Sequence, residues 1–172
     1  MRPKALFILT PGFAASETDS TCIPALQQFC LSLKNIAPGI SIVIFAFQYP
    51  FNPCSYQWNG INVIAFGGKN SKGFSRITLW LKIAAGFLAM RKNYDAVGIF
   101  SIWLTECALV GKILARWCAL KHYIWIMGQD ARSTNKYVKL VHPRPENLIA
   151  HSKFISAQME SNFSLLPAHI IG

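Results

Sequence analysis

The sequence has few acidic side chains and no long apolar run, and these two absences limit what the protein can be. Its 172 residues include 17 Lys and Arg but only 7 Asp and Glu, which gives a formal net charge of +10 at pH 7. The longest apolar stretch, residues 77–90, is fourteen residues long and contains Lys82, whereas a membrane-spanning helix needs about 20. The sequence therefore predicts no transmembrane helix. An apolar share of 52% excludes a disordered chain, and the length suits one domain.

Several common functional motifs are missing as well. The five cysteines are odd in number and have no C-x-x-C spacing, which favours reduced thiols in a cytosolic protein. The four histidines lack the spacing of a metal site. There is no G-x-G-x-x-G and no G-x-S-x-G motif. Residues 67–75 approach a phosphate-binding loop, but Phe74 stands where that loop needs lysine, so the sequence predicts no hydrolysis of ATP or GTP.

Short apolar runs alternate with helix-like patterns along the chain. Continuous apolar runs are typical of strands covered on both faces, and their alternation with helices is typical of βαβ crossovers. The sequence thus predicts a doubly wound, mainly parallel, Rossmann-like α/β sheet with helices on both faces. Ser20 or Thr21 is expected to cap the first helix, with Pro24 in its first turn. The predicted strands cover residues 5–9, 41–47, 61–66, 96–100, 123–127 and 148–150, and the predicted helices cover residues 21–35, 75–92, 104–120 and 153–163.

The predicted helix over residues 75–92 is apolar on nearly every side, which leaves two interpretations open. A helix of this kind packs deeply as a crossover between strands. Alternatively, it lies on a membrane surface, with Trp80 and Phe87 in the lipid and basic side chains against the headgroups. The bases expected at the headgroups are Arg76, Lys82, Arg91 and Lys92.

The positive charge is concentrated in the later part of the chain. Residues 1–68 carry three bases and two acids, whereas residues 69–153 carry fourteen bases and four acids. Such a field suits a nucleic acid, an anionic membrane surface or a phosphorylated substrate. A nucleic acid fits least, because the aromatic residues lie inside apolar runs rather than between bases.

The carboxyl ends of the predicted strands provide the candidate binding residues, because ligands of doubly wound folds bind there. The loop after the first strand offers a glycine, free backbone N–H groups and two carboxylates. The loop after the fifth strand presents an amide, a carboxylate and a guanidinium together, which suits hydroxylated or phosphorylated ligands. A serine begins the last helix. The candidates are Gly12, Glu17, Asp19, Gln129, Asp130, Arg132 and Ser152.

These candidates also have purely structural interpretations. Glu17 and Asp19 could favour the N-terminal dipole of the first helix. Asp130 and Arg132 could pair with each other within a capped turn. Ser152 could simply cap the last helix.

Taken in order, several segments resemble the N-terminal half of a glycosyltransferase of the GT-B fold, family 4 (group 1). The resemblance covers the whole chain. Each segment is similar to a motif of that family, from the first strand and its glycine to the approach to the interdomain linker. The segments are residues 5–12, 94–100, 126–130, 148–154 and 170–172.

The resemblance implies that residues 1–172 form one Rossmann-like acceptor-binding domain and that the C-terminal nucleotide-sugar domain is absent from this chain. It implies retaining transfer of a hexose-like sugar from a nucleotide sugar to a saccharide or lipid-linked acceptor, as in cell-envelope polysaccharide synthesis, and a fragment that is inactive alone. It implies no metal or other cofactor. The expected location is the cytoplasm, peripheral on the inner face of the plasma membrane, where the basic region 69–153 meets anionic lipid.

On this reading, Asp130 and Gln129 hold acceptor hydroxyls, Arg132 holds an anionic group of the acceptor, and Gly12 leaves room for the diphosphate of the donor. The alternative is a non-enzymatic, flavodoxin-like basic module that binds a polyanion, an anionic lipid or a protein partner.

Overall fold

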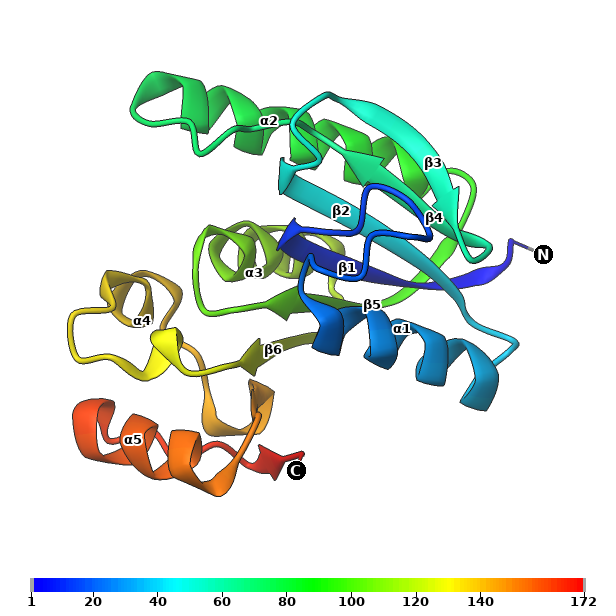
Figure 1. Cartoon of the computed structure of the whole chain (residues 1–172). Helices are drawn as coiled ribbons and strands as arrows, with labels where there is room; N and C mark the ends of the chain where they lie inside the picture. Colours follow the sequence, from blue (N-terminus) through cyan, green and yellow to red (C-terminus); the bar gives the residue numbers. More distant parts are fainter. Residues whose placement is uncertain (1, 172) are drawn as a thin grey trace. The chain divides into compact units, whose positions relative to one another are not determined.

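The computed structural model describes residues 2–171, which form two compact units divided between Gly98 and Ile99. Figure 1 shows the order of helices and strands along the chain. Within the two units, every pair of neighbouring strands is parallel except β3 and β4. The predicted mainly parallel α/β fold is therefore confirmed. No helix within the described residues has the length and apolarity needed to cross a membrane.

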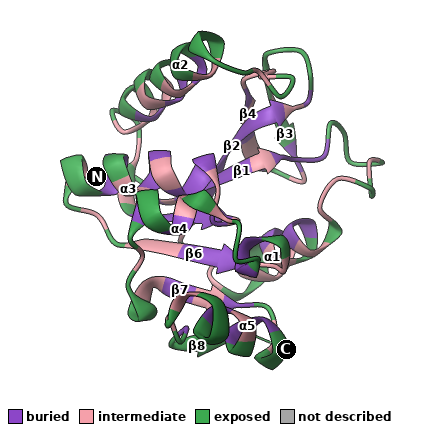
Figure 2. Ribbon diagram, turned by 90° about the vertical axis from the view of Figure 1, so that its left-hand side faces the viewer, coloured by how far each residue is buried: buried purple, intermediate pink, exposed green. Residues whose placement is uncertain are grey.

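The first unit is built from four strands in the order β3-β4-β2-β1 and two helices. In β2, seven consecutive residues are buried, which is the pattern of a strand covered on both faces. The helices α1 and α2 lie on opposite sides of β1 and β2 (Figures 1 and 2). The elements are β1 (Lys4–Gly12), α1 (Pro24–Ile36), β2 (Ser41–Tyr49), β3 (Cys54–Trp58), β4 (Ile61–Ala65) and α2 (Phe74–Met90).

An aromatic cluster holds α2 against the strands of the first unit. The ring of Phe87, on α2, lies 4.8 Å from that of Phe7 on β1 and 6.4 Å from that of Phe45 on β2. All three side chains are fully buried, and burying a phenylalanine stabilises a fold by about 1.5–3 kcal/mol. The expectation that Phe87 enters lipid is therefore wrong, because this ring belongs to the core.

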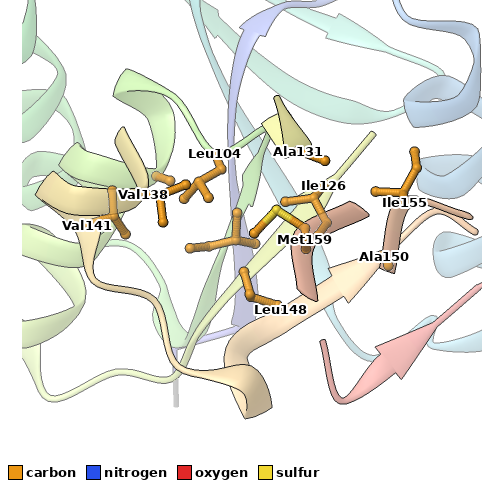
Figure 3. Close-up of a cluster of buried hydrophobic side chains, with 11 residues drawn as sticks. Leu104, Ile126, Ala131, Val138, Val141, Leu148, Ala150, Ile155 and Met159 are labelled. Atoms are coloured by element: carbon orange, nitrogen blue, oxygen red, sulfur yellow. The ribbon is translucent and has the colours of Figure 1, made fainter. Parts of the chain in front are cut away.

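The second unit contains the strands β5 to β8 in sequence order, all parallel. Its core is a cluster between strands and helices, in which Leu104, Ile126, Leu148 and Met159 are buried side by side (Figure 3). The elements are β5 (Asp95–Ile102), which continues from the first unit, α3 (Glu106–Cys118), β6 (His122–Ile126), η1 (Gln129–Ala131), α4 (Lys136–Val141), η2 (Pro145–Asn147), β7 (Leu148–Ala150), α5 (Lys153–Phe163) and β8 (His169–Ile170).

The sequence left five elements out, namely β3, η1, α4, η2 and β8. The strand β3 forms a hairpin with β4 through Asn59 and Gly60, whose φ angles are 47° and 72°. Two successive positive φ angles are typical of the tight turn that joins hairpin strands. Only Trp58 of β3 is buried. This strand therefore lacks the apolar run from which the predicted strands were recognised.

The beginning of α1 also differs from the prediction. The helix starts at Pro24, and its N-cap position is Ile23, which has a left-handed φ of 49° and forms no side-chain cap bond. Ser20 and Thr21 therefore do not cap α1. Pro24 does lie in the first turn, as predicted, because a residue there needs no amide hydrogen for the helix.

Candidate functional site

A cavity of about 480 Å³ lies at the carboxyl end of β6 in the second unit. Its walls come from the loop that follows β5, the turn that follows β6 and the start of α4. We call it the β6-end cavity. It is lined by Trp103, Thr105, Met127, Gln129, Asp130, Thr134, Asn135, Lys136 and Tyr137.

Asp130 joins two of these walls. Its side chain is 3% exposed. Oδ1 accepts a hydrogen bond from the backbone N–H of Leu104 at 3.1 Å, and Oδ2 accepts one from the backbone N–H of Met127 at 2.8 Å. Hydrogen bonds to a charged group contribute about 1.5–3 kcal/mol each. The carboxylate therefore fixes the loop after β5 against the end of β6.

Asn135 completes this arrangement. Its Nδ2 donates to the backbone carbonyl of Leu104 at 3.1 Å and to that of Asp130 at 2.9 Å, while its Oδ1 accepts from the N–H of Tyr137 at 2.9 Å. The last bond caps the N-terminus of α4. Together these contacts, the Asp130–Asn135 frame, hold three backbone segments of the cavity in fixed positions.

Burial raises the pKa of Asp130 from 3.8 to about 6, and the hydrogen bonds from Met127 and Leu104 oppose this rise. The desolvation of a charge in the protein interior is therefore the larger effect. A carboxylate whose oxygens already accept two backbone amides is well suited to hold the cavity wall.

The other candidate residues of the second unit, Gln129, Arg132 and Ser152, do not all line the β6-end cavity. Gln129 is exposed and lines the β6-end cavity. Arg132 is exposed and is not among the lining residues. The oxygens of Asp130 face backbone amides, so the suggested pair between Asp130 and Arg132 is wrong. Ser152 caps α5, because its Oγ accepts from the N–H of Ile155 at 3.3 Å.

Gly12, in the first unit, ends β1 and is buried. A Cβ placed there would stand 3.1 Å from Sγ of Cys22 and 3.4 Å from Cβ of Tyr49. Protein atoms therefore lie within contact distance of the Cβ position of Gly12, and room for a diphosphate beside this residue stays a prediction.

Asp19 and Glu17 hold the loop that follows β1. Asp19 accepts hydrogen bonds from the N–H of Ala15 at 3.0 Å, from the N–H of Thr21 at 3.1 Å and from the hydroxyl of Tyr49 at 3.1 Å. The bond from Ala15 contributes most to lowering the pKa of Asp19 to about 2. Glu17 accepts from the backbone N–H at position 59.

Neither carboxylate belongs to the first turn of α1, which contains no acid. Asp19 instead bonds within the loop that follows β1, and Glu17 bonds to the backbone of the hairpin turn at position 59.

Sequence reasoning missed most of the lining of the β6-end cavity. Trp103 and Thr105 follow β5 at its carboxyl end, which is where ligands of such folds bind, so their position after a predicted strand could have identified them. Thr134 shortly precedes the short helix α4 and Lys136 is its first residue, and this helix was not predicted.

The lining includes an indole, hydroxyls, two side-chain amides and one ammonium group, and hydrogen bonds fix the side chains of Asp130 and Asn135 among them. A cavity of this size and chemistry suits a small hydroxylated ligand. Aromatic side chains pack on the apolar faces of such ligands, while the surrounding donors and acceptors bind their hydroxyls.

No protein-family model matches the sequence, and neither does any curated protein. Solved structures do. A sucrose-phosphate synthase from Thermosynechococcus elongatus aligns with 99% of this chain at 13% identity, with a TM-score of 0.65, and the alignment covers 47% of that protein. A second structure of a sucrose-phosphate synthase from this organism aligns with 96% of the chain at 14% identity, with a TM-score of 0.59, and covers 85% of that structure.

A UGT transferase from Siraitia grosvenorii, in complex with UDP, aligns with 96% of the chain at 11% identity, with a TM-score of 0.57 and 47% of that protein covered. The chain thus spans about half the length of the first synthase structure and of this transferase. At such identities the similarity shows the fold alone, which is that of one Rossmann-like half of the GT-B fold.

Proposed function

We propose that the chain is the acceptor-binding half of a GT-B glycosyltransferase that moves a sugar from a nucleotide sugar to a saccharide or lipid-linked acceptor. The observation that carries this proposal is the β6-end cavity, at the carboxyl end of a parallel strand in a fold of this type. A solved structure with the same fold is in complex with UDP, which supports a nucleotide sugar as the donor.

In this proposal, the β6-end cavity holds the acceptor. Trp103 packs against the apolar face of a sugar ring, and Gln129 and Lys136 bind its hydroxyls. Asp130 positions the backbone around the sugar, because both of its oxygens bond to amides of the cavity wall. The proposal also includes membership of family 4 and retaining stereochemistry. It includes a donor site on a second half that residues 1–172 do not contain.

Saccharide binding by the 172-residue chain tests the acceptor role. Titration with a panel of hexoses, N-acetylhexosamines and disaccharides should give saturable binding to at least one of them. Gln129→Ala should weaken that binding about tenfold, as expected for the loss of one or two hydrogen bonds in a preformed site. Gln28→Ala, at an exposed position of α1, is the matched control and should bind as the original chain does.

The absence of binding to any saccharide would contradict the acceptor role. Sugar transfer by these 172 residues alone would contradict the proposal that they are one half of the enzyme. Binding of polyanions without any binding of saccharides would favour the non-enzymatic basic module instead.

We also propose that the enzyme works on an anionic membrane surface, to which α2 attaches it. Four apolar side chains spaced along α2 are exposed, by 83% at Phe74, 49% at Ile77, 66% at Leu81 and 44% at Leu88. Their spacing of three, four and seven residues places them along one side of a helix. Trp80 is partly buried, so this stripe replaces the lipid contacts predicted from the sequence.

The charge around α2 supports an anionic surface. Residues 20–94 contain no Asp or Glu, whereas residues 69–92 contain six Lys and Arg. An apolar stripe beside bases is typical of a helix that lies in the interface of an anionic bilayer.

Vesicle flotation tests this attachment. The chain should bind to vesicles that contain phosphatidylglycerol and much more weakly to vesicles of phosphatidylcholine alone. The double variant Phe74→Ser with Leu81→Ser should abolish binding. The control variant, Leu140→Ser with Phe154→Ser, removes two apolar side chains that lie outside α2 and are 52% and 68% exposed. It should leave binding unchanged. Binding that is indifferent to anionic lipid, or equal loss in both variants, would contradict the attachment.

A further inference from the structure

A second cavity of about 910 Å³ lies in the second unit at the opposite end of the same strands. Its lining includes residues at or just before the amino-terminal ends of β6, β7 and β8. We call it the basic cavity. The lining residues used below are Lys112, Arg116, Lys121, His122, Arg144 and His169.

These side chains come from separate parts of the chain. Lys112 and Arg116 are one turn apart on α3, Lys121 directly precedes β6, and Arg144 directly precedes η2. Three of the four histidines, at positions 122, 142 and 169, also line the cavity. In the sequence they lack the spacing of a metal site, and the fold gathers them beside basic residues instead.

The basic cavity gathers charge of one sign. It is lined by four of the eight Lys and Arg in residues 99–172 and by one of the four acids there, Glu146. That carboxylate lies 3.9 Å from Arg144 and is 63% exposed. Within residues 2–171, Arg116 and Lys121 have no carboxylate partner. Like charges in a concave surface repel one another and strengthen the local positive potential, so an anion bound there is stabilised.

One wall of the basic cavity is held rigidly. Nε2 of His122 lies 2.9 Å from Oγ of Ser101, which donates to the backbone carbonyl of Cys107 at 3.1 Å. Since that hydroxyl hydrogen is used, Nε2 of His122 is the donor to Ser101. A Cβ at position 111 would stand 2.7 Å from this Nε2, so glycine there allows α3 to approach the ring.

The ammonium of Lys112 is held as well, because it donates to the backbone carbonyl of Val141. Its position is therefore fixed before a ligand arrives, whereas Arg116 and Lys121 remain available at the exposed rim. Burial, and to a smaller degree Lys112, lowers the pKa of His122 to about 4. The ring is therefore neutral at pH 7, and Lys and Arg supply the positive charge.

We propose that the basic cavity binds a small phosphate-bearing anion with at least two negative charges, of the size of a diphosphate. Lys112 and the guanidinium of Arg116 would face one phosphate, and Lys121 and Arg144 would face the rest of the anion. Arginine forks and lysine point charges are the usual protein partners of phosphate. The site lies at the other end of the strands from the β6-end cavity, so it is independent of the proposed acceptor role.

Calorimetric titration of the 172-residue chain with inorganic pyrophosphate tests this proposal. The chain should bind about one pyrophosphate saturably, and Arg116→Gln with Lys121→Gln should weaken binding about tenfold or more, as expected for losing charge-assisted hydrogen bonds. These two side chains are exposed, so the variant should fold, which its unfolding temperature checks.

The matched control is Lys4→Gln with Lys153→Gln. It removes the same charge from two exposed positions outside both cavities, and its affinity for pyrophosphate should stay within about twofold of the original, because distant surface charges are screened. Equal weakening in the two variants would show attraction by net charge alone and would overturn the proposal. The absence of saturable binding by the original chain would overturn it too.

Discussion

Nδ2 of Asn135 donates to the backbone carbonyl of Asp130 at 2.9 Å, while the carboxylate of that same aspartate bonds to amides on two other segments. The two residues therefore act together. The side chain of Asn135 holds the backbone of the turn at Asp130, and the side chain of Asp130 holds the backbone at Leu104 and Met127. Because their bonds connect the loop after β5, the end of β6 and the start of α4, the shape of the β6-end cavity depends on both.

Asn135→Ala should destabilise the protein by about 2–4 kcal/mol, because it leaves two backbone carbonyls without their donor and removes the cap of α4. Urea unfolding measures this loss. Asn135→Asp keeps the capping oxygen but turns a second carboxylate oxygen toward the two carbonyls, so it should lose at least as much stability as Asn135→Ala. Equal stability of Asn135→Ala and the original chain would show that the Asp130–Asn135 frame contributes nothing.

The raised pKa of Asp130 predicts how the free energy of unfolding changes with pH. Its folded pKa of about 6 lies above the ordinary 3.8, so the folded state binds this proton more tightly than the unfolded chain. The stability that the group contributes is present below about pH 4 and is lost as the pH rises to about 6. The free energy of unfolding of the original chain, minus that of Asp130→Asn, should therefore fall between pH 4 and 6. A difference that rises over this range would contradict the assignment.

His122 should act in the opposite direction. Its folded pKa of about 4 lies below the ordinary 6.5, so the unfolded chain binds the proton more tightly. The contribution to stability is present above about pH 6.5 and is lost as the pH falls to about 4. Relative to His122→Gln, the original chain should therefore gain stability from pH 4 to 6.5, by an amount on the order of 3 kcal/mol. Parallel unfolding curves for the two proteins would contradict this.

Gly111→Ala tests how closely α3 packs on the wall of the basic cavity. The new Cβ would stand 2.4 Å from Oγ of Ser101 and 2.7 Å from Nε2 of His122, and overpacking of this kind costs about 1–3 kcal/mol. Gly39→Ala is the control, because nothing lies within 4 Å of a Cβ there. Thermal unfolding should show a large loss for the first variant and little change for the second.

The sequence was sufficient for the parts of the fold that local chemistry determines. The predicted bounds of β7 and α5 agree with the structure, because a short apolar run ends two residues before Ser152, whose hydroxyl caps the helix. The strand β2 was recognised from its β-branched and aromatic residues.

The candidate site could be predicted only in part. Gln129 and Asp130 were found because they follow a predicted strand, but the role of Asp130 depends on an amide 26 residues away, at Leu104. Asp19 likewise bonds to Tyr49, 30 residues away. The remaining lining comes from loops and from a helix of six residues, which is too short to show a hydrophobic period.

NMR spectroscopy of side-chain N–H groups shows residue by residue whether a saccharide acceptor binds in the β6-end cavity. During titration with a saccharide that binds, the signals of the Trp103 indole and of the Gln129 and Asn135 amides should shift with one common affinity. The indole of Trp117, 71% exposed on α3, should not move. If these cavity signals stay unchanged while the saccharide saturates another part of the chain, the β6-end cavity is not the acceptor site.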